Sequence, residues 1–179
     1  MNRSVPTLQI AGFLFTSVVG TVLHFLFEWS GGSIAAALVS AVNESIWEHM
    51  KLIYVPILLF SWAEYFIFGK TMRSYWCIKL VGFLTALLLI PVIYYSYTGI
   101  LGINADWFNI TIFFLAAGAA FYLETRLFQN NWECALPGWA APVLILMLGG
   151  MFLLFTFQPP QLPLFQDPLN QSYGYARVS

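Results

Sequence analysis

The stretch that decides the fold is residues 76–97, WCIKLVGFLTALLLIPVIYYSY, which carries one charged side chain, Lys79. About 20 residues of helix are needed to cross the hydrocarbon core of a bilayer, and this run meets that length. Its centre, Val81–Ile93, does not alternate between apolar and polar residues as a barrel strand does. An open sheet is excluded because lipid cannot satisfy its edges. The stretch therefore predicts a membrane-spanning helix.

Four further stretches are long and apolar enough to form spans. They run from about Leu8 to Glu28, Asn43 to Phe68, Trp107 to Leu127 and Trp139 to Phe157. The fold class predicted is therefore all-α, an integral membrane bundle of about five transmembrane helices.

Two domains are expected, a transmembrane bundle over residues 1–157 and an extended tail over residues 158–179. The tail holds four prolines among polar residues, so it cannot continue the last helix. Its Leu162, Leu164 and Phe165 are expected to pin it to the bundle, with Asp167 beside the polar cluster described below. The segment Ser30–Val42 is too short to span and contains Gly31 and Gly32, which predicts an interfacial or re-entrant turn.

The composition agrees with a chain whose main partner is the lipid bilayer. Apolar and aromatic residues make up 60% of the chain and charged residues 8%, against roughly 25% charged in a soluble domain. The net charge of −1 and the lack of a basic run exclude nucleic acid as a partner. Cys77 and Cys134 form neither a disulfide framework nor a zinc motif, and both are predicted to be packed thiols.

The orientation follows from the distribution of Lys and Arg. Five passes place five cations on the side of the N-terminus and two on the other side: Arg3, Lys70, Arg73, Lys79 and Arg126 against Lys51 and Arg177. Cytoplasmic loops are enriched in Lys and Arg, so the N-terminus is predicted to be cytoplasmic and the C-terminus outside. Lys79 is predicted to reach the interface with its long side chain, rather than to form a buried group with Glu64 and Glu124.

Charged and polar side chains gather where the first span ends and the second begins. The candidate ligand-binding residues are His24, Glu28, Asn43, Glu44, Ser45, Glu48, His49 and Lys51. Ionisable groups within a membrane are costly and are normally paired or functional. On a helix, Glu44, Glu48 and Lys51 fall on one stripe, and Ser45 and His49 fall on the next. The two spans run antiparallel, so contact between their polar ends is expected.

Local signals describe the start of the second span. Asn43 is predicted to cap it, with Glu44 in the first turn. His24 and Glu28, four residues apart, are expected to share one face of the preceding helix.

Two strings in this region, HFLFEW at 24–29 and NESIWEHMKL at 43–52, resemble an uncharacterised family of small bacterial multi-pass membrane proteins. Members of that family carry His-x-x-x-Glu at the end of the first span and Asn-Glu-Ser-x-Trp-Glu-His-x-Lys at the start of the second. The resemblance covers residues 20–56. It implies a bacterial plasma-membrane protein and transfers no activity, catalytic residue or cofactor.

Three functions are compatible with the cluster. The preferred interpretation is a site for an ion or small polar ligand near the extracytoplasmic end of the first two spans. One alternative is a metal-dependent, membrane-embedded hydrolase using His24, Glu28, Glu44, Glu48 and His49. No metal ligand is assigned, because the His-Glu-x-x-His spacing is absent and Lys51 would repel a cation. The other alternative is a structural subunit with a membrane-protein partner, in which these residues only pair and seal helix ends.

Overall fold

A computed structural model describes residues 4–175, and over that range the chain folds into helices without a named strand. Five helices there are long and apolar enough to cross a membrane. They are α1 (Ser4–Trp29), α3 (Ile46–Ile67), α4 (Tyr75–Leu101), α5 (Asp106–Gln129) and α6 (Ala140–Phe157). The predicted all-α bundle is confirmed, and these apolar helices indicate an integral membrane protein.

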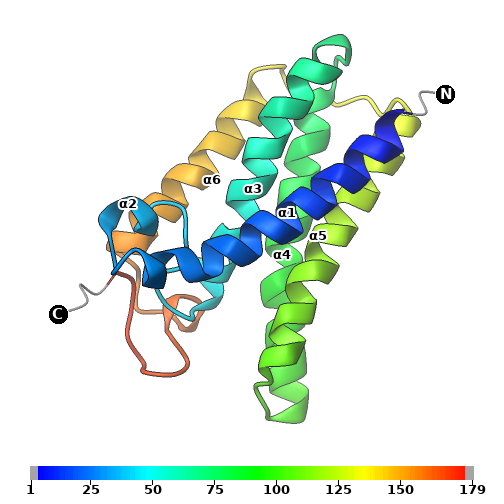
Figure 1. Cartoon of the computed structure of the whole chain (residues 1–179). Coiled ribbons are helices and arrows are strands. Elements are labelled where there is room, and N and C mark those ends of the chain that lie inside the picture. The colour runs from blue at the N-terminus through cyan, green and yellow to red at the C-terminus, as the bar shows by residue number, and fades with distance from the viewer. Residues whose placement is uncertain (1–3, 176–179) are drawn as a thin grey trace.

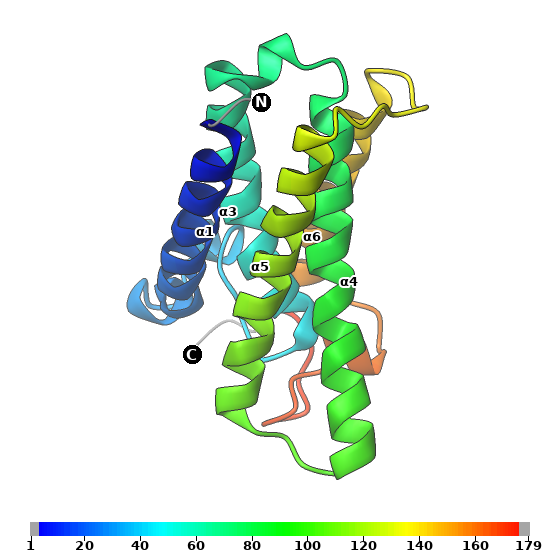
Figure 2. The same ribbon diagram turned by 90° about the vertical axis from the view of Figure 1, so that its right-hand side faces the viewer.

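Successive long helices run in opposite directions, so the bundle has two ends (Figure 1). The N-terminal face carries the start of α1, the α3–α4 connection with the short helix η1 (Gly69–Thr71), and the α5–α6 connection. The tail face carries the α1–α3 and α4–α5 connections and the C-terminal segment that follows α6. Figure 2 shows that the hairpin of α4 and α5 extends farther at the tail face than the other helices do.

Two glycines let helix α1 pack closely against α3 and α5. A Cβ added at Gly12 would lie 2.5 Å from the ring of Phe121 and 2.6 Å from that of Phe60. One added at Gly20 would lie 2.5 Å from the ring of Phe113. Small residues at such crossings let helices in lipid approach each other, where no hydrophobic force drives them together. Gly20 also places the end of α1 beside the site described below.

The segment between α1 and α3 does not span, as its length predicts. Gly31 and Gly32 adopt positive φ angles of 66° and 75°, which turn the chain after α1. Ser33 then caps the four-residue helix α2 (Ile34–Ala37), accepting a hydrogen bond from the Ala36 amide at 3.2 Å. Ala36 and Ala37 are buried while Ile34 and Leu38 are exposed, so protein covers one side of this turn.

The tail folds back over the tail face. Its short helix η2 (Pro163–Phe165) buries Phe165 against Trp47 of α3, with ring centroids 4.8 Å apart, and against Phe155 of α6 at 5.4 Å. Farther along, the Tyr175 amide donates to the Thr156 carbonyl at 2.7 Å. The tail therefore closes the ends of α3 and α6 instead of leaving the bundle.

We expect Phe165→Ala to release the tail, because burial of this ring is its main apolar anchor. Phe→Ala changes in cores cost about 3–5 kcal/mol. A loss of even ~1.4 kcal/mol makes local opening tenfold more frequent, so chymotryptic cleavage within the tail should accelerate by at least tenfold. The matched control is Leu162→Ala, since Leu162 is 55% exposed. Equal cleavage of both variants would contradict this anchoring role.

Two predictions about the N-terminal face are wrong. Lys79 does not reach the interface: its side chain is fully buried and pairs with Glu64 and Glu124. Cys77 and Cys134 are not separate packed thiols, because a disulfide joins the start of α4 to the α5–α6 connection. The sequence separates these cysteines by 57 residues, and only the return of the chain through α5 brings them together.

Candidate functional site

The polar cluster predicted from the sequence divides into two parts with different surroundings. The first part is an ion pair between Lys51 and Glu48, with the Lys51 Nζ 2.6 Å from the Glu48 Oε2 and both side chains about 1% exposed. The ammonium also donates to the Ala37 carbonyl at 2.9 Å and to the Thr156 hydroxyl at 2.8 Å. The Val42 amide donates to Glu48 at 3.2 Å. The hydrogen-bonding capacity of this ion pair is therefore taken up by protein groups, and these bonds join α2, α3 and α6.

The residues that start α3 position both parts. Ser45, not Asn43, is the N-cap: its backbone is extended and its hydroxyl accepts from the Glu48 amide at 3.4 Å. Glu44 therefore precedes the helix, and the acidic residue of the first turn is Glu48 instead. The Asn43 amide nitrogen donates to the Gly174 carbonyl at 3.2 Å, and the Asp167 carboxylate accepts from the Glu44 amide at 3.3 Å. The predicted position of Asp167 beside the cluster is therefore confirmed. Together these bonds join the tail to the start of α3.

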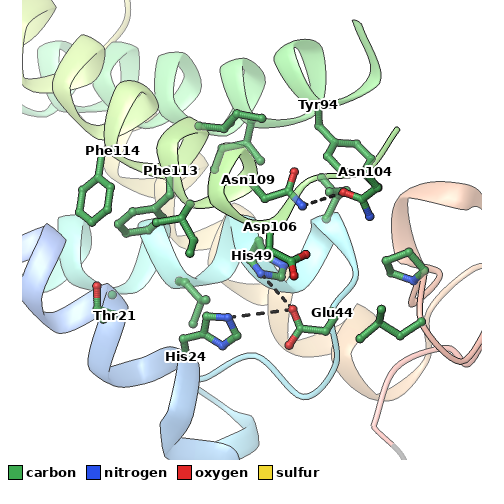
Figure 3. Close-up of a pocket in the computed structure, with 18 of the residues that line it drawn as sticks. Thr21, His24, Glu44, His49, Tyr94, Asn104, Asp106, Asn109, Phe113 and Phe114 are labelled. Atoms are coloured by element: carbon green, nitrogen blue, oxygen red, sulfur yellow. Dashed lines mark hydrogen bonds and ion pairs between the residues drawn. The ribbon is translucent and has the colours of Figure 1, made fainter. Parts of the chain in front are cut away.

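The second part consists of His24, Glu44 and His49, which we call the His–Glu group (Figure 3). The Glu44 Oε2 lies 3.4 Å from the His49 Nε2 and 4.0 Å from the His24 Nε2. The two imidazole rings meet nearly edge to face, with centroids 5.3 Å apart. One ligand atom from each residue lies within 4.8 Å of the others, and all three side chains are partly buried. Glu28 is exposed and is not part of this group.

A backbone contact fixes the orientation of the His49 ring. Its Nδ1 lies 2.9 Å from the Ser45 carbonyl oxygen. A carbonyl only accepts hydrogen bonds, so Nδ1 carries the hydrogen and donates it. The Nε2 atom that faces Glu44 is then either protonated or free to bind a cation. A histidine that donates Nδ1–H to a carbonyl and presents Nε2 is the usual arrangement of a metal-ligating imidazole.

The His–Glu group opens into a cavity of about 420 Å³ between α1, α3, the α4–α5 hairpin and the tail. One wall is polar and comes from Tyr94 of α4, from Asn104 in the connection, and from Asp106 and Asn109 of α5. Most of the other lining residues are apolar. They include Phe25, Ile90, Ile110, Phe113 and Leu169. The cavity thus combines a charged end with an apolar wall.

A hydrogen-bond network holds the polar wall in place. The Tyr97 hydroxyl donates to the Asn109 Oδ1 at 2.5 Å, and the Asn109 amide donates to the Asn104 Oδ1 at 2.8 Å. The Tyr97 hydroxyl also accepts from the Ala105 amide at 3.3 Å. Sequence reasoning missed Asn104, Asp106 and Asn109. The only available signal was that the five-pass topology brings the start of α5 to the same face as His24 and Glu44.

Comparison with known proteins identifies one family. The model of a family of unknown function, DUF6512, matches residues 4–175. No curated protein and no solved structure matches the chain.

Proposed function

Since the chain belongs to DUF6512, a family of unknown function, we propose its function from the site itself. We infer that this integral membrane protein binds a divalent transition-metal ion through His24, Glu44 and His49. The observation that carries the proposal is the convergence of two imidazole nitrogens on one carboxylate oxygen from two separate elements, α1 and the start of α3.

Two of the three separations among the ligand atoms approach those of a metal site, and all three are within 4.8 Å. Zinc bonds of ~2.0–2.1 Å in a tetrahedron place neighbouring ligand atoms about 3.3–3.4 Å apart. The Glu44 Oε2 and the His49 Nε2 are 3.4 Å apart, and a shift of well under 1 Å would bring His24 from 4.0 Å to the same separation. Imidazole and carboxylate ligands suit zinc and iron(II).

The charges around the site also favour a cation. Lys51, which in the sequence argues against a metal, is neutralised by Glu48 and points to Ala37 and Thr156. The cavity beside the His–Glu group contains a second carboxylate, Asp106. Two carboxylates and two imidazoles with no ammonium among the lining residues form an environment that attracts a divalent cation.

The cavity favours a metal-dependent hydrolase as a second candidate. Catalytic zinc sites have three protein ligands and leave a fourth position for water or substrate. A bound metal would lower the pKa of its water, and Asp106 in the same cavity would serve as the base. The apolar wall beside it suits a substrate with a hydrocarbon part. The remaining alternative, a structural subunit, predicts that no metal binds.

The test of the proposal is a metal titration of tag-free, chelator-treated protein in lipid nanodiscs. A polyhistidine tag must be removed because it binds metal itself. We expect close to one tightly held Zn²⁺ per chain, released on acidification because imidazole ligands must be deprotonated to bind. Fewer than about 0.1 ions per chain would contradict the proposal and leave a small polar ligand or a structural role.

We also propose that the protein lies in a bacterial plasma membrane with its N-terminal face in the cytoplasm. Lys51 and Lys79 are buried in ion pairs. The exposed cations within residues 4–175 are then Lys70, Arg73 and Arg126, all at the N-terminal face. The disulfide at the same face favours the opposite orientation, because the cytosol keeps thiols reduced. The proposed orientation therefore predicts that this pair is a dithiol in the cell.

A labelling experiment decides the orientation. In a background with Cys77→Ser and Cys134→Ser, one cysteine is introduced at the exposed Ile103 of the tail face or the exposed Asn130 of the N-terminal face. A membrane-impermeant maleimide is expected to label Ile103→Cys in intact cells and Asn130→Cys only after permeabilisation. The reverse pattern would overturn the proposed orientation and assign the disulfide to an oxidising compartment.

A further inference from the structure

A second polar group lies inside the other end of the bundle, separate from the His–Glu group. It consists of Glu64 of α3, Lys79 of α4 and Glu124 of α5, all fully buried. The Lys79 Nζ lies 3.1 Å from the Glu64 Oε2 and 2.5 Å from the Glu124 Oε2. Gln9 of α1 and Tyr75 of α4 join it through hydrogen bonds to Glu64. We call these five residues the Lys79 network.

The charges of the Lys79 network do not balance. Helix α1 contributes the uncharged Gln9, and the sequence of α6 contains no titratable side chain. The titratable groups that face one another are therefore Glu64, Glu124, Lys79 and the Tyr75 hydroxyl. Two ionised carboxylates with one ammonium would leave a net charge of −1 in a buried site. An uncompensated buried charge is costly, and a carboxylate in that position takes up a proton instead.

The hydrogen bonds distinguish the two carboxylates. Glu64 accepts from the Gln9 amide at 2.6 Å and from the Tyr75 hydroxyl at 3.0 Å, and it pairs with Lys79. Three donors stabilise its ionised form. Glu124 receives Lys79 at Oε2, while its Oε1 has no hydrogen-bond partner among the described residues. Glu124 is therefore the carboxylate that an added proton would neutralise.

Two further observations describe the surroundings of the unpaired oxygen of Glu124. The Gln9 Oε1 is buried and, like the Glu124 Oε1, finds no donor within residues 4–175. Gly82 makes room for the Glu124 carboxylate, because a Cβ there would overlap its Oε1. Buried acceptors are normally satisfied. A proton on Glu124 removes the excess charge and gives the network one additional donor.

The network has a route to the N-terminal face. Tyr75 donates to Glu64 and to the Ser61 carbonyl, and it also lines a cavity of about 450 Å³ with Lys70, Arg73 and Glu133. Tyr75 therefore connects the cavity at the N-terminal face with the buried carboxylate of Glu64.

We propose that the Lys79 network is a proton-binding site, in which Glu124 takes up one proton and Tyr75, hydrogen-bonded to Glu64, connects the network to the cavity at the N-terminal face. On loading, a proton adds to the Glu124 Oε1 and the carboxylate becomes a neutral acid, while Lys79 stays paired with Glu64. On release, the proton leaves and Lys79 is shared by both carboxylates. The site lies at the opposite end of the bundle from the proposed metal site and does not depend on it.

Infrared spectroscopy of the protein in lipid nanodiscs tests this proposal, because a protonated carboxyl has a carbonyl stretch that a carboxylate lacks. We expect about one protonated carboxyl per chain at neutral pH, where an ordinary Glu with a pKa near 4.3 is ionised. The band should disappear in Glu124→Gln. It should remain in Glu28→Gln, the matched control, since Glu28 is exposed at the other end of the bundle.

A second variant and the wild-type protein test the proposal even if Glu124→Gln fails to fold. Glu124→Asp, which keeps the acid, should shift the band instead of removing it. A wild-type protein without the band at neutral pH would overturn the proposal with no variant needed. A band that persists in folded Glu124→Gln would overturn it as well, because the proton would then reside elsewhere.

Discussion

The variant His49→Ala is expected to lower the affinity for Zn²⁺ by more than a hundredfold. Removing groups that only orient a ligand already costs about 10–100-fold in metal affinity, and His49 is proposed as a ligand itself. Its ring is also the one whose Nδ1 is fixed by the Ser45 carbonyl, which holds its Nε2 toward Glu44. Glu44→Gln should have a comparable effect, since it removes the negative charge that the cation needs.

The measurement is a Zn²⁺ titration in competition with a chelator of known affinity, carried out on tag-free protein. Glu28→Gln is the matched control, because it removes a carboxylate four residues from His24 on an exposed surface. This control is expected to bind Zn²⁺ like the wild type. If Glu28→Gln weakened binding as much as His49→Ala does, the ligands would be different from those proposed.

The variant Lys51→Met is expected to destabilise the protein by about 3–5 kcal/mol, the typical cost of removing one partner of a buried ion pair. The Glu48 carboxylate would remain buried and charged. The Ala37 carbonyl and the Thr156 hydroxyl would lose their ammonium donor at 2.9 and 2.8 Å. Because these bonds join α2, α3 and α6, the tail face should lose its order first.

Denaturant or thermal unfolding in a fixed detergent measures this loss, with Lys70→Met as the control at an exposed lysine. Adding Glu48→Leu to Lys51→Met should recover part of the stability, since replacement of a whole buried pair is often nearly neutral. A Lys51→Met protein as stable as the control would show that the buried pair does not hold the helices together.

Much of the fold followed from the sequence because lipid imposes a simple rule. Five apolar runs of about 20 residues have to be helices in lipid. The ends of the observed helices lie within a few residues of the ends of the predicted spans. The exceptions came from local chemistry. Ser45 replaces Asn43 as the N-cap because the Asn43 side chain bonds to the Ser45 and Gly174 backbones instead.

The site could be predicted only in part. Helical spacing placed Glu44, Glu48 and Lys51 on one stripe and His49 on the next. Only Glu48 and Lys51 stay together in the structure, because Glu44 precedes α3 and its carboxylate lies 3.4 Å from the His49 Nε2. Spacing along one helix does not reveal which distant element covers each stripe. Thr156 of α6 covers the ion pair, and the start of α5 with Asp106 faces the His–Glu group. These contacts come from more than 50 residues away in the chain.

The same limit explains the error at Lys79. A lysine five residues into a span can either extend to the interface or pair inside the bundle, and its own sequence neighbours are the same in both cases. Lys79 pairs inside the bundle because Glu64 of α3 and Glu124 of α5 lie at the same depth as its ammonium group. Gly82 leaves the space that the Glu124 carboxylate needs to reach it.

X-ray absorption spectroscopy of the zinc-loaded protein in lipid tests the proposed metal site most directly. A site built from His24, Glu44 and His49 predicts a first shell of nitrogen and oxygen atoms at ~2.0–2.1 Å from the zinc. The multiple-scattering signal should correspond to two imidazoles in the wild type and to one imidazole in His49→Ala. A first shell containing sulfur at ~2.3 Å, or one of oxygen atoms alone, would contradict it, because the metal would then be held by the cysteines or by surface carboxylates and water.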